Sequence, residues 1–71
     1  MTLDEFDALV RKTELDLGLL QRYGQVLFNT LAQVRPDLAE EIRGSDIDPF
    51  YCYEYNTPRV IGAWTLIMDR W

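Results

Sequence analysis

The sequence predicts a small all-α domain, and three observations support that prediction. Apolar residues recur at steps of three and four along most of the chain, which is the spacing of one helix face. Helix-start and helix-stop residues separate these segments, with Pro36, Gly44 and Pro58 the clearest. At 71 residues the chain has room for one domain, residues 1–71, built as a bundle of three to four helices with an aromatic-rich turn before the last.

The first helix is predicted to begin at the N-terminus. Thr2 and Glu5 have the spacing of a capping box and precede a run of apolar residues at helical spacing. Thr13 and Asp16 repeat this start signal in a weaker form, because aspartate is not the usual partner at the second position. The first helix therefore either breaks near residues 11–13 or continues through them.

A long helix is predicted from Asp16 to Val34. Its apolar stripe consists of Leu20, Tyr23, Leu27, Leu31 and Val34, widened by Leu19, Val26 and Phe28. Gly24 lies in the middle, where glycine weakens a helix by about 1 kcal/mol relative to alanine. We therefore expect another element to pack closely against Gly24, the alternative being a local kink.

The second half of the chain contains two proline-started helices. Pro36 begins a short helix that Gly44 terminates as a left-handed residue. A single turn is predicted from Pro49 to Tyr51, and a last helix from Pro58 to about Asp69 with Thr57 as its N-cap. The alternative for residues 50–55 is an extended segment, because Phe50 and its neighbouring tyrosines are β-prone.

Composition excludes several classes of function. The net charge of −5 disfavours binding to nucleic acids and to anionic membranes, and the longest apolar run is too short to cross a bilayer. Cys52 is the single cysteine and histidine is absent, so no internal disulfide, zinc site or Cys-His nucleophile is expected. These observations predict a cytoplasmic protein that is not an enzyme and needs no metal or cofactor.

Two stretches are candidates for binding another protein. The first is acidic and includes Asp37, Glu40, Glu41 and Asp46. It is either a solvated face around a turn or a surface that docks on a basic groove. The second is aromatic and includes Tyr53 and Tyr55 with Phe50, Tyr51, Trp64 and Trp71. Its members are either core residues or binding residues, since tyrosine and tryptophan are enriched at binding hot spots.

The last predicted helix provides a third candidate. Its apolar residues surround most of the helix circumference, and a helix of that kind is expected to be buried on nearly all sides. A domain of this size has little material to cover it fully. We therefore expect that Ile61, Met68 and Trp71 form a face covered by a second copy or a partner protein, unless the first helix covers it.

Residues 34–51 resemble a segment of small, uncharacterised phage-encoded proteins. The shared pattern is Arg-Pro-x-Leu-Ala-x-x-Ile-x-Gly, from Arg35 to Gly44, leading into Asp-Pro-Phe-Tyr at residues 48–51. The resemblance covers a quarter of the chain and implies a phage origin without implying catalytic residues. By analogy it suggests an inhibitor or modulator of a host protein, in the defence or transcription machinery of the host cytoplasm. The alternative is a homodimerising structural or accessory protein with no separate ligand.

Overall fold

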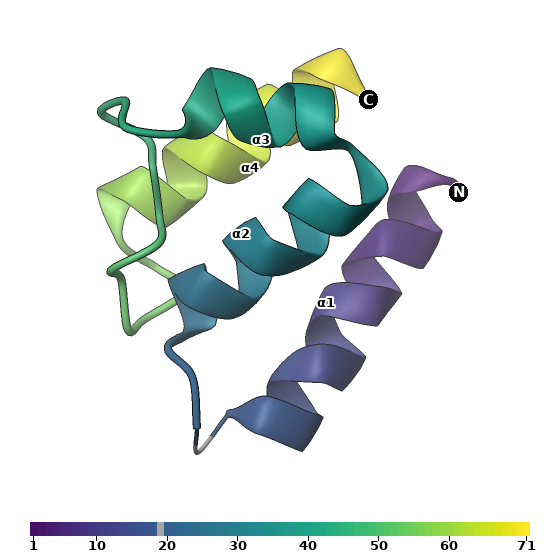
Figure 1. The fold of residues 1–71 in the computed structure, drawn as a ribbon, viewed down its shortest axis with the longest axis vertical. Coiled ribbons are helices and arrows are strands. Elements are labelled where there is room, and N and C mark those ends of the chain that lie inside the picture. The colour runs from purple at the N-terminus through teal and green to yellow at the C-terminus, as the bar shows by residue number, and fades with distance from the viewer. Residues whose placement is uncertain (19) are drawn as a thin grey trace.

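The computed structural model describes residues 1–18 and 20–71, which contain four helices. The helices are α1 (Leu3–Leu17), α2 (Tyr23–Val34), α3 (Pro36–Ile42) and α4 (Pro58–Arg70). Helices α1 and α2 form an antiparallel hairpin, and α3 and α4 run antiparallel to each other beside it (Figure 1). The predicted all-α fold is therefore confirmed, with the aromatic-rich turn between α3 and α4.

Helix α1 begins with the predicted capping box. The Thr2 side chain accepts a hydrogen bond from the Glu5 backbone at 3.1 Å, and the Glu5 carboxylate accepts one from the Thr2 backbone at 2.8 Å. The helix continues through Thr13, whose hydroxyl donates to the Leu9 carbonyl at 2.8 Å and so cannot cap a new helix. The second start signal was therefore wrong, and the continuous alternative is the one observed.

The predicted single helix from Asp16 to Val34 is also wrong. Helix α1 ends at Leu17, whose carbonyl accepts backbone hydrogen bonds from Leu20 at 2.8 Å and Gln21 at 2.9 Å, and α2 begins at Tyr23. Leu19, which the prediction placed in the same helix, lies outside the described residues. The chain turns between the two helices and returns as the second arm of the hairpin.

The close approach predicted at Gly24 is confirmed. Its backbone N–H donates to the Cys52 carbonyl at 2.9 Å, and a Cβ added to it would collide with the Pro49 carbonyl oxygen. Gly24 is in the first turn of α2, where the backbone N–H has no partner within the helix. The loop before α4 supplies that partner and is thereby fixed to the start of α2.

The turns after α3 form as the local signals indicate. Gly44 has a φ of +70°, the left-handed conformation predicted for it. The Asp48 carboxylate accepts backbone hydrogen bonds from Gly44 at 2.7 Å and Phe50 at 3.0 Å. Cys52 closes the predicted turn by donating to the Pro49 carbonyl at 2.8 Å. Residues 50–51 and 54–55 lie in turns and a bend, residues 52–53 belong to no helix or strand, and no continuous extended segment spans 50–55.

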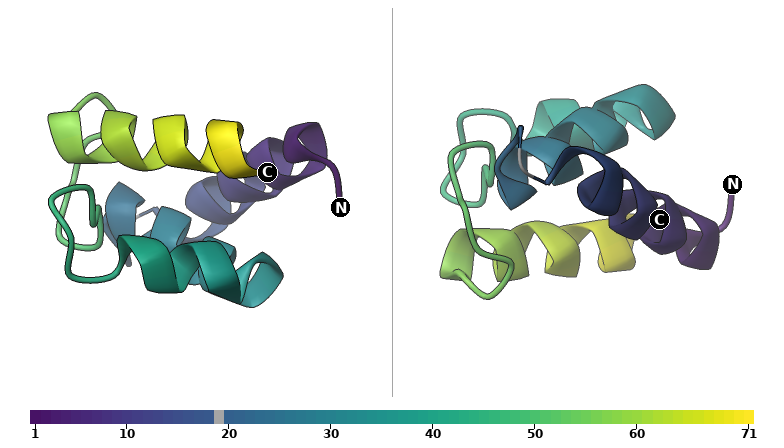
Figure 2. Two further views of the ribbon diagram at one scale, coloured as in Figure 1. Left: turned by 90° about the horizontal axis from the view of Figure 1, so that it is seen from above. Right: turned by 90° about the horizontal axis from the view of Figure 1, so that it is seen from below.

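The core lies where the four helices meet, and each contributes to it. Its buried members are Phe6, Val10, Leu27, Phe28, Leu31, Leu38, Ala39, Ile42, Val60, Ala63 and Ile67. The Phe6 ring lies 5.6 Å from the Trp64 ring and 4.9 Å from the Trp71 ring, measured between centroids. These aromatic pairs join the start of α1 to α4, and the two helices diverge from that junction (Figure 2).

Candidate functional site

The acidic stretch is largely neutralised by arginines of the same chain. Arg35 donates to both carboxylate oxygens of Asp37 at 3.1 and 3.0 Å, and this pair lowers the pKa of Asp37 below its usual value. Arg43 lies 3.3 Å from the Glu40 carboxylate, within the same turn of chain. These carboxylates are exposed, and each is paired with an arginine of the same chain.

Glu41 and Asp46 differ in their surroundings. Glu41 pairs with Arg70 at 2.9 Å, which joins α3 to the end of α4. Asp46 is exposed and, among the residues that the structure describes, makes no ion pair. The four acidic residues predicted to bind a partner therefore do not form one continuous charged surface. Three of them have a structural partner, and exposed pairs of this kind each contribute about 0–1 kcal/mol.

The aromatic-rich loop between α3 and α4 carries the most exposed tyrosines of the described chain. Tyr51, Tyr53 and Tyr55 are 79%, 77% and 72% exposed. The Arg22 guanidinium lies 5.2 Å from the Tyr51 ring centroid and 5.8 Å from that of Tyr53, and Arg22 Nε donates to the Phe50 carbonyl at 3.2 Å. We call Arg22, Tyr51 and Tyr53 the tyrosine surface.

Tyr55 follows the tyrosine surface along the chain, shortly before α4 begins. Its ring makes an edge-on contact with Tyr23 at 6.3 Å between centroids. The Tyr23 hydroxyl accepts a hydrogen bond from the Trp64 indole Nε1 at 3.1 Å. Burial raises the pKa of Tyr23, and the nearby carboxylates of Glu14 and Asp7 act in the same direction. Tyr23, the first residue of α2, therefore connects that helix to the loop through Tyr55 and to α4 through Trp64.

Helix α4 is less buried than its composition suggested. Val60, Ala63 and Ile67 face the core, whereas Ile61 and Met68, seven residues apart on one face, are 55% and 57% exposed. The predicted face of Ile61 and Met68 is thus open in the single chain. The expectation that nearly all of this helix would be buried holds only for its core side.

Trp71 does not belong to that exposed face. It lies seven residues after Trp64, so both side chains stand on the flank of α4 that meets Phe6. Its indole donates to the Met1 carbonyl at 3.2 Å, and its ring lies 5.2 Å from the Arg35 guanidinium. Trp71 is partly buried by the N-terminal helix, as the alternative in the prediction allowed.

A groove of about 290 Å³ runs between α1 and α4. It is lined by Leu3, Asp4 and Asp7 from α1 and by Trp64 and Met68 from α4. Asp7 pairs with Arg11 at 3.2 Å in an exposed contact one turn apart. We call this feature the α1–α4 groove. The groove combines apolar side chains with carboxylates. Its residues come from the two ends of the chain, so neither segment of sequence predicts the groove by itself.

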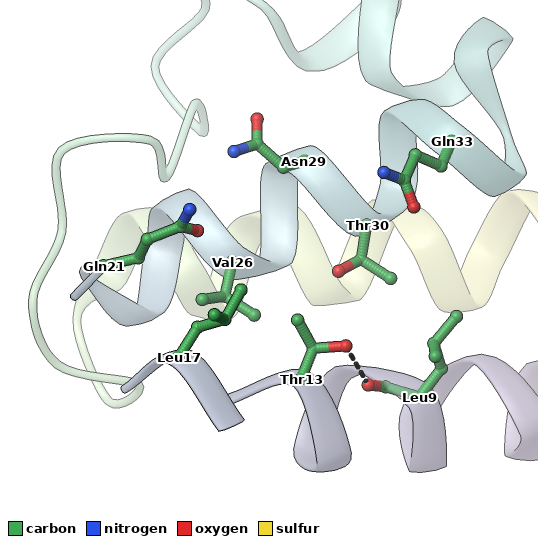
Figure 3. Close-up of a pocket in the computed structure, with 8 residues that line it drawn as sticks. All are labelled: Leu9, Thr13, Leu17, Gln21, Val26, Asn29, Thr30 and Gln33. Carbon is green, nitrogen blue, oxygen red and sulfur yellow. Dashed lines mark hydrogen bonds between the residues drawn. The ribbon is translucent and has the colours of Figure 1, made fainter. Parts of the chain in front are cut away.

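A second pocket, of about 180 Å³, lies between α1 and α2 (Figure 3). Leu9, Leu17 and Val26 give it apolar walls, and it is also lined by Thr13, Gln21, Asn29, Thr30 and Gln33. Its polar groups are neutral amides and hydroxyls, one of which is already bonded within α1. These groups can form hydrogen bonds, but none is a nucleophile paired with a base.

The described residues assemble no metal centre. Across residues 1–18 and 20–71, no three metal-binding side chains of His, Cys, Asp or Glu gather closely enough to hold an ion. Cys52 is a free, partly buried thiol. None of the described helices has the length and apolar character needed to cross a membrane.

Sequence reasoning missed three contributors to these surfaces. Arg22 was not considered, because its position over the loop requires the turn that separates α1 from α2. Asp4 and Asp7 were not considered as site residues, although their spacing of three does place them on one helix face. This face of α1 lines a groove because α4 packs beside it in the fold. No family model, curated protein or solved structure matches this chain.

Proposed function

We propose that this chain is a small acidic protein-interaction module that binds its partner through the tyrosine surface. The supporting observation is the exposure of Tyr51 and Tyr53, both above three-quarters, at one end of the bundle. Tyrosine contributes a large apolar area together with a hydroxyl, and is enriched among the residues that dominate binding energy. Exposed aromatic clusters of this kind are characteristic of interfaces.

The backbone beneath these tyrosines is held in place by specific contacts. Cys52 lies between them and makes two backbone hydrogen bonds, one to Gly24 and one to Pro49. Arg22 adds a third contact to the Phe50 carbonyl. A binding loop that is already ordered loses less conformational freedom on association. This arrangement supports binding by a preformed surface, and we expect no enzymatic activity from it.

The more specific proposal is a phage-type inhibitor or modulator of a host protein of the defence or transcription machinery. It is supported by the resemblance of residues 34–51 to phage-encoded proteins. That segment ends at Tyr51, and its Asp48 side chain orders the turn that presents the tyrosines. The proposed partner would be met in the host cytoplasm.

A homodimer is the alternative, and the observation that favours it is the exposure of Ile61 and Met68 on α4. Sedimentation at micromolar concentration separates the two proposals. A homodimerising protein sediments at twice the chain mass, whereas a module for a separate partner sediments as a monomer.

The experiment that tests the tyrosine surface is co-purification from the native host with three matched chains. The unmodified chain should recover one stoichiometric partner, and the double variant Tyr51→Ser, Tyr53→Ser should lose it. Leu15→Ser is the control, because Leu15 is 86% exposed and lines none of the surfaces described above. Recovery of the partner by the double variant at the native level would contradict the proposal.

A further inference from the structure

We infer that the α1–α4 groove receives a lysine- or arginine-bearing amphipathic helix of the partner protein. The inference rests on the proposed function and assigns the chemistry of the partner at a second surface. The groove is open in the single chain, since Asp4 and Met68 are exposed and Leu3 and Trp64 are only partly buried. Its two walls differ in character, and that difference indicates what would fill it.

The α4 wall is apolar and elongated. Trp64 and Met68 line it, and Ile61 continues the same side of the helix toward its N-terminus. These residues extend over seven positions, or about 10 Å along the helix axis. An apolar strip two turns long matches the stripe of an amphipathic helix, whose anchors recur at three- and four-residue steps.

The α1 wall is anionic. Asp4 and Asp7 stand one turn apart, and among the described residues Asp4 makes no ion pair. Asp7 pairs with Arg11, but the two side chains are 42% and 76% exposed, and a pair this open to solvent contributes only about 0–1 kcal/mol, so little is lost when Asp7 pairs with another cation. A helix lying in the groove would therefore place lysine or arginine beside its apolar stripe, next to these carboxylates.

The base of the groove is already ordered for such a ligand. The Trp64 indole is held by Tyr23 on one side and packs on Phe6 on the other. The methylene stem of a lysine or arginine can lie along an aromatic surface while its charge reaches a carboxylate. An ordered indole lowers the entropic cost of that contact.

A second copy of this chain fits the groove less well. The chain carries a net charge of −5, and a symmetric contact would place the same carboxylates from both copies at one interface. Like charges brought together there would repel each other. The same sign excludes a phosphate backbone as the occupant.

The test is an NMR titration of the full-length ¹⁵N-labelled chain with two synthetic helical peptides. One peptide has a leucine face flanked by lysines, and the other has glutamate in place of every lysine. The lysine peptide should shift the Trp64 indole N–H resonance and the backbone resonances of Asp4, Asp7 and Met68. The glutamate peptide should leave them unchanged. Equal shifts with both peptides, or shifts confined to the tyrosine surface, would overturn the inference.

A matched pair of variants tests the anionic wall. Asp4→Asn with Asp7→Asn should weaken binding of the lysine peptide by about two- to fivefold for each charge removed. Asp16→Asn with Glu54→Gln makes the same change in net charge outside the groove and should bind as the unmodified chain does. Equal weakening in both would show attraction to overall charge and refute a groove-specific site. If the groove variant retains the partner in co-purification while the tyrosine variant loses it, the proposed function stands and the groove assignment fails.

Discussion

The Tyr23 hydroxyl accepts a hydrogen bond from the Trp64 indole at 3.1 Å, which joins α2 to α4 across 41 positions of the sequence. Tyr23 also contacts Tyr55, and Trp64 also contacts Phe6 and lines the α1–α4 groove. This pair therefore connects the α1–α4 groove with Tyr55, which follows the tyrosine surface along the chain. Its geometry determines how the Trp64 ring is presented to the groove.

Replacing Tyr23 with phenylalanine should lower the free energy of unfolding by about 1 kcal/mol, because the partly buried indole N–H loses its acceptor. Chemical denaturation followed by tryptophan fluorescence measures this loss. Tyr51→Phe is the control, since the Tyr51 side chain is exposed and its loss of a hydroxyl should leave stability unchanged. Equal stability of the two variants would show that the hydrogen bond contributes nothing.

Alkaline pH should destabilise the fold through the same residue. The pKa of Tyr23 in the folded state is raised above its ordinary value of 10.0, chiefly by burial. The folded chain thus holds this proton more tightly than the unfolded chain, so the stabilising contribution is present below about pH 10 and is lost as pH rises through the folded-state pKa. Denaturation at about pH 9 and pH 11 should show a smaller decline for Tyr23→Phe than for the unmodified chain.

Replacing Gly24 with alanine should destabilise the protein by about 1–3 kcal/mol, because the new Cβ would collide with the Pro49 carbonyl oxygen. Helix propensity acts in the opposite direction and alone would favour alanine by about 1 kcal/mol. The sign of the change in a thermal melt therefore distinguishes the two effects. A higher melting temperature would mean that the loop moves away from α2 without penalty.

Replacing Met68 with aspartate should leave the fold intact, with a change in stability within about 0.5 kcal/mol, because the Met68 side chain is more than half exposed. Circular dichroism and a thermal melt check this. Ala63→Asp, at a fully buried position of the same helix, should unfold the chain and serves as the contrast. If Met68→Asp also unfolds the chain, Met68 belongs to the core.

Local signals in the sequence predicted the ends of most helices. The Thr2–Glu5 box, the Thr57 cap, Pro36 at a helix start and the left-handed Gly44 all depend on residues within a few positions of each other. Interactions of that range are available from sequence spacing alone. The same reasoning predicted that another segment packs closely against Gly24, but it did not identify that segment as the loop before α4.

The break between α1 and α2 could not be read in the same way, because helical spacing continues across it. The turn brings Gly24 against the loop at Pro49 and Cys52, which lie far along the chain. The candidate surfaces likewise depend on contacts between segments that are far apart in the sequence. The Glu41–Arg70 pair and the packing of Trp71 on Phe6 join residues whose proximity only the tertiary fold creates.

The hydrogen bond from the Trp71 indole to the Met1 carbonyl brings the first and last residues to one corner of the molecule. A tag or fused domain would therefore leave from that corner whichever residue carries it. A short linker could join the two residues, and the chain could be reopened within the exposed loop at residues 54–56. Such a circularly permuted chain would keep every helix and would move the free ends to the tyrosine side, away from the α1–α4 junction.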